Sequence, residues 1–79
     1  MDNTLLVSRQ LNFPHLMRIA EGMSYKHSEV IIKARGKQIQ RAVEVAVMLQ
    51  QRGRGRIVST AYSVEGELHI PSIIINMTV

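Results

Sequence analysis

The spacing of apolar residues along the chain predicts strands and helices in alternation. Residues 5–8 form a short apolar run that polar residues follow, which is typical of a strand. Asn12 can cap a helix that has Pro14 in its first turn, and the apolar residues after it repeat at helical spacing. We therefore expect a first strand over residues 5–8 and an amphipathic helix that ends at about residue 24.

The middle of the chain contains a second strand and a segment with two possible interpretations. Residues 29–35, EVIIKAR, are rich in β-branched side chains and predict a strand that Gly36 ends. Residues 42–49 also alternate as a strand would, but their apolar stripe continues with helical spacing until Gly53. Such a segment is too long for an ordinary strand, so we expect a helix over residues 37–52.

Two apolar residues fall outside the core stripe of this helix. Val45 and Met48 lie on its flank, between Arg41 and Arg52, where polar residues would be expected. We interpret them, with part of the final strands, as the contact surface of a homodimer.

The last third of the chain has the pattern of a β-hairpin. Residues 57–64 and 68–79 predict two strands around a turn at Glu65 and Gly66, and Pro71 favours an edge or a bulge at the start of the last strand. The complete order is β-α-β-α-β-β. We expect one α+β domain over residues 1–79, a two-layer sandwich with two helices on one face of a four-stranded mixed sheet.

Length and composition narrow the class of protein. A chain of 79 residues buries a small core, so a second copy would help to stabilise it. Cysteine is absent, which excludes disulfides and zinc–thiolate sites, and no apolar run is long enough to cross a membrane. The first residues lack the basic start of a secretory signal, so we expect a cytoplasmic protein.

Positive charge is concentrated in the middle of the chain. The net charge is +4, and seven of the ten Lys and Arg residues lie between Lys33 and Arg56, where Glu44 is the one acid. The remaining residues carry more acids than cations. This segregation indicates a binding surface for a polyanion, although a solvated basic face is the simpler alternative.

The most informative segment is IIKARGKQIQR, residues 31–41. Gly36 permits a sharp turn from strand to helix, although glycine at such a place is often a simple helix entry. Arg35 ends the strand, and Lys37 and Arg41 are one helical turn apart, so all three can reach one stretch of phosphates. Backbone contacts of this kind carry little sequence specificity.

The segment SEVIIKARGKQIQRAVEVA, residues 28–46, closely resembles the strand–glycine–helix signature of the Alba family. Alba proteins are small archaeal chromatin and RNA-associated proteins, with relatives among ribonuclease P subunits. The resemblance extends to VSRQLNFPH near the N-terminus and to the two hairpin strands. It implies a homodimer that binds DNA, RNA or both on the chromosome or nucleoid, with no membrane, cofactor or small-molecule substrate.

The resemblance also assigns residues outside the central segment. Arg9 and Gln10 occupy the place of the family's lysine pair, which contacts nucleic acid, and the arginine keeps a cation there without a site for lysine acetylation. The hairpin, a long basic arm in the family, is short here and carries Glu65 and Glu67. Arginines in the RGRGR loop offer a substitute contact, or else simply a solvated loop: Arg52, Arg54 and Arg56.

Other kinds of site find little support. The three histidines are too far apart in sequence for a metal site, and we find no catalytic set, so we predict no metal and no enzyme activity. Aromatic residues are scarce, which argues against base stacking on single strands. Two alternatives stay open: an RNA-binding subunit of a ribonucleoprotein such as ribonuclease P, and a protein-interaction module that has lost nucleic-acid binding.

Overall fold

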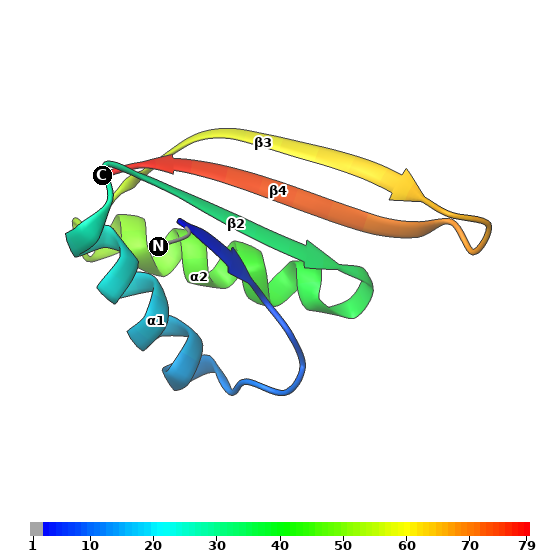
Figure 1. The fold of residues 1–79 in the computed structure, drawn as a ribbon, viewed down its shortest axis with the longest axis horizontal. Helices are drawn as coiled ribbons and strands as arrows, with labels where there is room; N and C mark the ends of the chain where they lie inside the picture. Colours follow the sequence, from blue (N-terminus) through cyan, green and yellow to red (C-terminus); the bar gives the residue numbers. More distant parts are fainter. Residues whose placement is uncertain (1–2) are drawn as a thin grey trace.

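Strands and helices follow one another in the predicted β-α-β-α-β-β order (Figure 1). The computed structural model describes residues 3–79, apart from the side chain of Glu65. A single turn of 3-10 helix, η1, precedes the second helix. The elements are β1 (Thr4–Leu6), α1 (Phe13–Lys26), β2 (Glu29–Arg35), η1 (Gly36–Gln38), α2 (Ile39–Gln51), β3 (Arg56–Glu65) and β4 (Ile70–Thr78).

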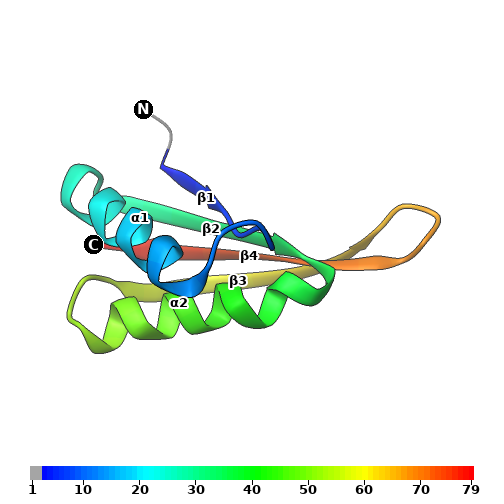
Figure 2. The ribbon, with the colours of Figure 1, turned by 90° about the horizontal axis from the view of Figure 1, so that it is seen from below.

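The sheet has the strand order β1-β2-β4-β3 and is mixed, as predicted. β1 runs parallel to β2, while β4 is antiparallel to both of its neighbours. Figure 1 shows both helices on one side of the sheet and none on the other, and Figure 2 views the molecule from the helix side. Because β1 and β2 are parallel, their C-terminal ends lie at the same end of the sheet, and after each of them the chain turns toward a helix.

The core lies between the helices and the sheet. Alternate residues of β2 point into it, and Ile32 pairs with Ile75 of β4 on the buried face. Leu16 of α1 and Leu49 of α2 cover these strands and are also fully buried. Burial of one such side chain contributes about 1.5–3 kcal/mol, which makes this layer the main source of stability.

The first strand is shorter and the first helix longer than predicted. The amide of Val7 still donates to the carbonyl oxygen of Lys33 (2.9 Å), but the chain then leaves the sheet. There the amide of Gln10 donates to the Ser8 hydroxyl (3.3 Å), a local bond that competes with strand pairing. α1 begins after Asn12, whose side chain accepts from the His15 amide (2.9 Å), as the cap prediction requires.

The hairpin of β3 and β4 extends past the end of β2 (Figure 1). β2 ends opposite Ser72, and two further pairs, Val64 with Pro71 and Glu65 with Ile70, continue toward the turn. β4 as a whole is a central strand, so the prediction of an edge strand holds only at Pro71, where the side away from β3 has no neighbouring strand.

The second helix confirms the helical interpretation, but one of its residues lies elsewhere than expected. Val45 has 0% of its surface exposed and belongs to the core, so its predicted place on the flank is wrong. The physical reason is that α2 packs against α1 on one side and against the sheet on the other, which buries a wide arc of the helix. Within residues 3–79, no helix has the length and apolar character needed to span a membrane.

Candidate nucleic-acid interface

The ends of the two parallel strands place several cations at one edge of the sheet. Arg35 is the last residue of β2, and Arg9 lies in the loop after β1; both side chains are exposed. Lys33, two residues before Arg35, is on the same face of β2 because strand side chains alternate. These three cations line one hollow of about 430 Å³. We call them the strand-end cations.

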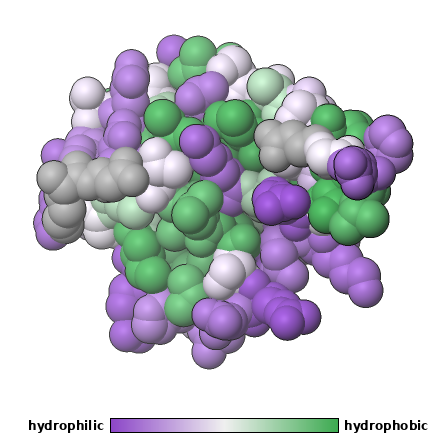
Figure 3. Space-filling view, turned by 45° about the vertical axis from the view of Figure 1, so that its right-hand side comes forward, coloured by the Kyte–Doolittle hydropathy of each residue, from purple (hydrophilic) through white to green (hydrophobic). Residues whose placement is uncertain are grey.

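Lys33 is not among the site residues predicted from the sequence, although the alternation of side chains along a strand indicates it. A strand with lysine and arginine at positions 33 and 35 presents both on one face by its period of two. Figure 3, which brings this end of the molecule forward, shows apolar surface with hydrophilic side chains beside it.

Gly36 makes the sharp turn that was predicted for it. Its φ angle is +56°, a left-handed conformation that side chains with a Cβ adopt at a cost of roughly 1 kcal/mol or more. The turn leads into η1, where the Ile39 amide donates to the Gly36 carbonyl oxygen, so α2 begins later than predicted. Lys37 is exposed on this turn, at the same end of the molecule as Arg35.

Arg41 has a different position from the predicted one. Its Nη1 donates to the carbonyl oxygens of Ser8 (3.1 Å) and Leu11 (2.8 Å), so the guanidinium is held against the loop between β1 and α1. Arg41 is therefore half-buried, unlike the exposed Lys37, and its predicted contact with phosphate stays a prediction. Arg41 fixes the loop that carries Arg9.

The same loop presents Arg9 and Gln10 to solvent. Both side chains are exposed, and the loop is closed by the bonds of Arg41 and by the Leu11 amide, which donates to the Ser8 carbonyl oxygen (3.4 Å). A closed loop holds Arg9 near the end of β2 with little loss of backbone freedom on binding. Direct contacts of Arg9 and Gln10 with nucleic acid stay a prediction.

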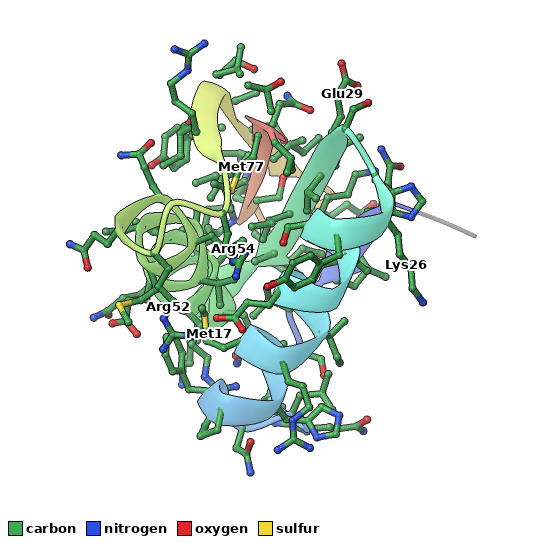
Figure 4. All side chains as sticks on the ribbon, turned by 90° about the vertical axis from the view of Figure 1, so that its left-hand side faces the viewer. Met17, Lys26, Glu29, Arg52, Arg54 and Met77 are labelled. Atoms are coloured by element: carbon green, nitrogen blue, oxygen red, sulfur yellow. The ribbon has the colours of Figure 1, made fainter. Side chains whose placement is uncertain are left out.

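The RGRGR loop lies at the opposite end of the sheet. Arg56 is paired through β4 with the start of β2, about 20 Å along that strand from Arg35. Arg52 forms an ion pair with Glu21 of α1, and the Arg54 guanidinium lies 4.4 Å from the ring centroid of Tyr25. Figure 4 shows Arg52 and Arg54 between α2 and α1.

These contacts separate the predicted cations into two groups. The first group lies at the strand ends and includes the tied Arg41, while the second consists of the three arginines between residues 52 and 56. Two members of the second group are engaged by α1. The structure therefore does not bring the two groups onto one surface within a single chain.

An exposed apolar surface lies on the flank of α2 that faces β3. Gln50 accepts a hydrogen bond from the Ile57 amide (3.0 Å), which identifies this flank. Tyr62 and Val64 of β3 are 68% and 61% exposed, and Val47 of α2 is also exposed. With the half-buried Val43, these residues form what we call the α2–β3 flank.

The predicted dimer contact falls on the other side of α2. Val45 has no surface to offer a partner, and Met48 is half-buried between the positions of Arg41 and Arg52, which both face the α1 side. The sequence signal for the α2–β3 flank was the spacing of Tyr62 and Val64, two apart on one face of a strand. The prediction of a contact at Met48 itself stays untested.

The histidines lie in three separate places. His15 is in the first turn of α1, His27 is its C-terminal cap, and His69 is in the hairpin turn. Among the described residues, no three His, Asp or Glu side chains lie together in a way that could hold a metal ion.

Comparisons with known proteins agree with this architecture. A family model described as Alba matches residues 3–64. The crystal structure of ALBA1 from Trypanosoma brucei is similar with a TM-score of 0.88 and 22% identity, over 96% of this chain and 68% of that one. Alba from Thermoplasma volcanium is similar with a TM-score of 0.84 and 22% identity, over 96% and 99% of the two chains. At this identity, the two structures support the fold.

Proposed function

Since this chain belongs to the Alba family, whose members are generally nucleic-acid-binding, we propose that it binds the phosphate backbone of DNA or RNA without sequence specificity. The observation that carries the proposal is the group of strand-end cations. Arg9, Lys33 and Arg35 come from two strand ends and line one hollow, with no acid beside them among the described side chains.

The chemistry of these cations suits phosphate. Arginine can bind a phosphate through two parallel N–H donors, while lysine acts as a point charge. Each phosphate contact releases counterions from the nucleic acid, which makes binding strongly dependent on salt. None of the three aromatic residues lies among the strand-end cations: Phe13 packs on the core, Tyr25 lies under Arg54, and Tyr62 is on the α2–β3 flank.

We further propose that the active form is a homodimer joined through the α2–β3 flank. β3 is an edge strand, and an edge with exposed apolar side chains tends to associate. A two-fold contact would cover Tyr62 and Val64 in both copies and double the number of phosphate contacts. Such a dimer would act in the cytoplasm as an architectural component of the chromosome or nucleoid.

The dimer can be tested by mass measurement in solution. Val47→Lys puts a charge into the α2–β3 flank and should shift the protein toward monomer in light scattering after size exclusion. Gln51→Lys is the matched control, because it adds the same charge at an exposed position of α2 outside the flank. A wild type that is monomeric at high concentration would overturn the proposed dimer.

One observation favours RNA in a ribonucleoprotein as a second candidate. Residues 57–79, which form nearly all of the hairpin, contain no Lys or Arg, and Glu67 is exposed in its turn. An arm without cations has little attraction for the phosphates that border the minor groove of DNA. Competition between a DNA duplex and a structured RNA of equal phosphate number would separate the two candidates.

The basic test of the proposal is a series of binding measurements against salt. We expect the affinity for a duplex to fall steeply as salt rises, with a slope of about −0.9 per phosphate contact on DNA. A flat dependence, or no binding at low salt to either DNA or RNA, would contradict the proposal.

A further inference from the structure

The hollow at the strand ends has a floor that phosphate binding does not require. Leu6 of β1, Lys33 of β2 and Ile74 of β4 are register partners in one row, on the sheet face that has no helix. Leu6 and Ile74 line the hollow, and Leu6 is 67% exposed. An exposed and a half-buried aliphatic side chain on either side of Lys33 combine an apolar surface with positive charge.

Two other hollows among the described residues lack this combination. One of about 360 Å³ is lined by Glu29 and Arg56, so an acid offsets its cation. Another, also about 360 Å³, is lined by Glu21 and Arg52, which form an ion pair with each other. The strand-end hollow is the one of the three in which the cations have no acidic neighbour.

We propose that the strand-end hollow takes one unpaired nucleotide of a bound strand, with its base on the aliphatic floor and its phosphate at the cations. The inference rests on the proposed function and adds a ligand subsite to it. An apolar cavity with a few polar groups at its edge is the usual form of a small-ligand site, and about 430 Å³ is within the range of such sites.

The polar residues of the hollow suit a nucleotide. Arg9 and Arg35 can bind the phosphates on either side of the base, and Gln38 lines the same hollow with a side-chain amide that can bond a base edge. A paired base would have to leave its stack to enter, at a cost of a few kcal/mol. A base that is already unpaired enters without that cost, so the hollow selects for unpaired positions.

The wall of the hollow is also held in place before binding. Ser8 and Arg9 line it, and Arg41 binds the Ser8 carbonyl oxygen on one side of Arg9 and the Leu11 carbonyl oxygen on the other. A preformed wall reduces the ordering cost when a base enters. Binding of the base therefore requires no rearrangement of the loop.

The test compares duplexes that differ at one position. The probe is a duplex with a single bulged 2-aminopurine, prepared as DNA and as RNA, beside a fully paired duplex and a duplex with an abasic bulge. The abasic bulge has the same phosphates and the same bendability without a base. We expect the bulged base to raise affinity about tenfold over both controls, because it covers part of the aliphatic floor, and we expect its fluorescence to change on binding.

Two variants identify the floor. Leu6→Ala should remove the preference for the bulged base and leave affinity for the paired duplex unchanged. Val58→Ala is the matched control, because Val58 is 61% exposed and lines the hollow near Arg56 instead. Ile74→Ala, a second variant, shortens the other aliphatic residue of the floor and should also weaken the preference, even if Leu6→Ala were to disturb the fold.

The outcomes separate this inference from the proposed function. Equal affinity for bulged, abasic and paired duplexes would overturn the subsite and leave backbone binding standing. The subsite would also be overturned if Leu6→Ala and the wild type had the same preference for the bulged base while circular dichroism showed both proteins to be folded. If the protein bound none of these duplexes, whether DNA or RNA, the proposed function itself would be rejected.

Discussion

The two groups of cations in this chain look alike in sequence and differ in the structure. At the strand ends, Arg9 and Arg35 are exposed beside a hollow that no described acid lines. In the RGRGR loop, Arg52 is paired with Glu21, and Arg54 lies over the ring of Tyr25. Exposed cations without a partner in their own fold are thus available to a ligand, while paired cations are already engaged.

The difference arises from what each group faces. The loop after α2 lies against the C-terminal half of α1, which presents a carboxylate and an aromatic ring. The strand ends face solvent on the sheet side that lacks helices. Thus one group helps to hold the helices together, and the other is free to bind phosphate.

The largest expected effect comes from removal of the free cations. Arg9→Gln with Arg35→Gln should lower the affinity for a duplex about a hundredfold at low salt, since each charged hydrogen bond to phosphate contributes roughly 1.5 kcal/mol or more. Fluorescence anisotropy with a labelled duplex measures this. Arg52→Gln with Arg54→Gln removes the same charge, and an equal loss of affinity in that control would break the comparison.

An intermediate effect is expected at Arg41, which belongs to the strand-end group but is already bonded. Arg41→Met leaves the Ser8 and Leu11 carbonyl oxygens without this donor and should lower the free energy of unfolding by about 1–2 kcal/mol. Denaturant titration is the measurement. Lys37→Met loses the same charge from an exposed side chain, so its unfolding midpoint should not move; a matching shift would argue against the loop-holding role.

A smaller effect on stability is expected in the other group. Arg54→Gln removes the cation from the exposed ring of Tyr25 and should cost about 0.5–1 kcal/mol of unfolding free energy. The same substitution in a Tyr25→Leu background should cost nothing further. A full cost in that background would show that the arginine stabilises the loop by some other contact.

The smallest effect concerns the ion pair of Arg52 with Glu21. Both side chains are partly exposed, so Glu21→Gln should lower the unfolding free energy by less than about 1 kcal/mol, and salt should reduce the difference further. Thermal unfolding at low and high salt measures it. An increase in duplex affinity in this variant would indicate that Arg52, once released, also reaches phosphate.

Local signals explain what could be predicted from the sequence. Gly36 has the left-handed angle that its place before a helix indicates, and Asn12 caps the helix that follows it. The period of two in β2 and the period of 3.6 in the helices were sufficient for the order of elements. These features depend on residues within a few positions of one another.

What could not be predicted from the sequence all involves contacts between residues that are far apart in the chain. The partners of Arg41 are about thirty positions away, and the pairing of Arg52 with Glu21 spans 31 positions. Val45 was assigned to the flank because the sequence does not reveal that α2 is covered from two sides. Val45 therefore has no surface left for a partner, and the dimer contact predicted at Met48 stays a prediction.

The most direct test of the central claim is the salt dependence of duplex binding for three proteins: wild type, Arg9→Gln with Arg35→Gln, and Arg52→Gln with Arg54→Gln. If the strand-end cations hold phosphate, their removal should reduce the slope of log affinity against log salt by about 0.9 per lost contact. The loop variant should keep the wild-type slope. An unchanged slope for the strand-end variant, or an equal reduction for both variants, would contradict the account.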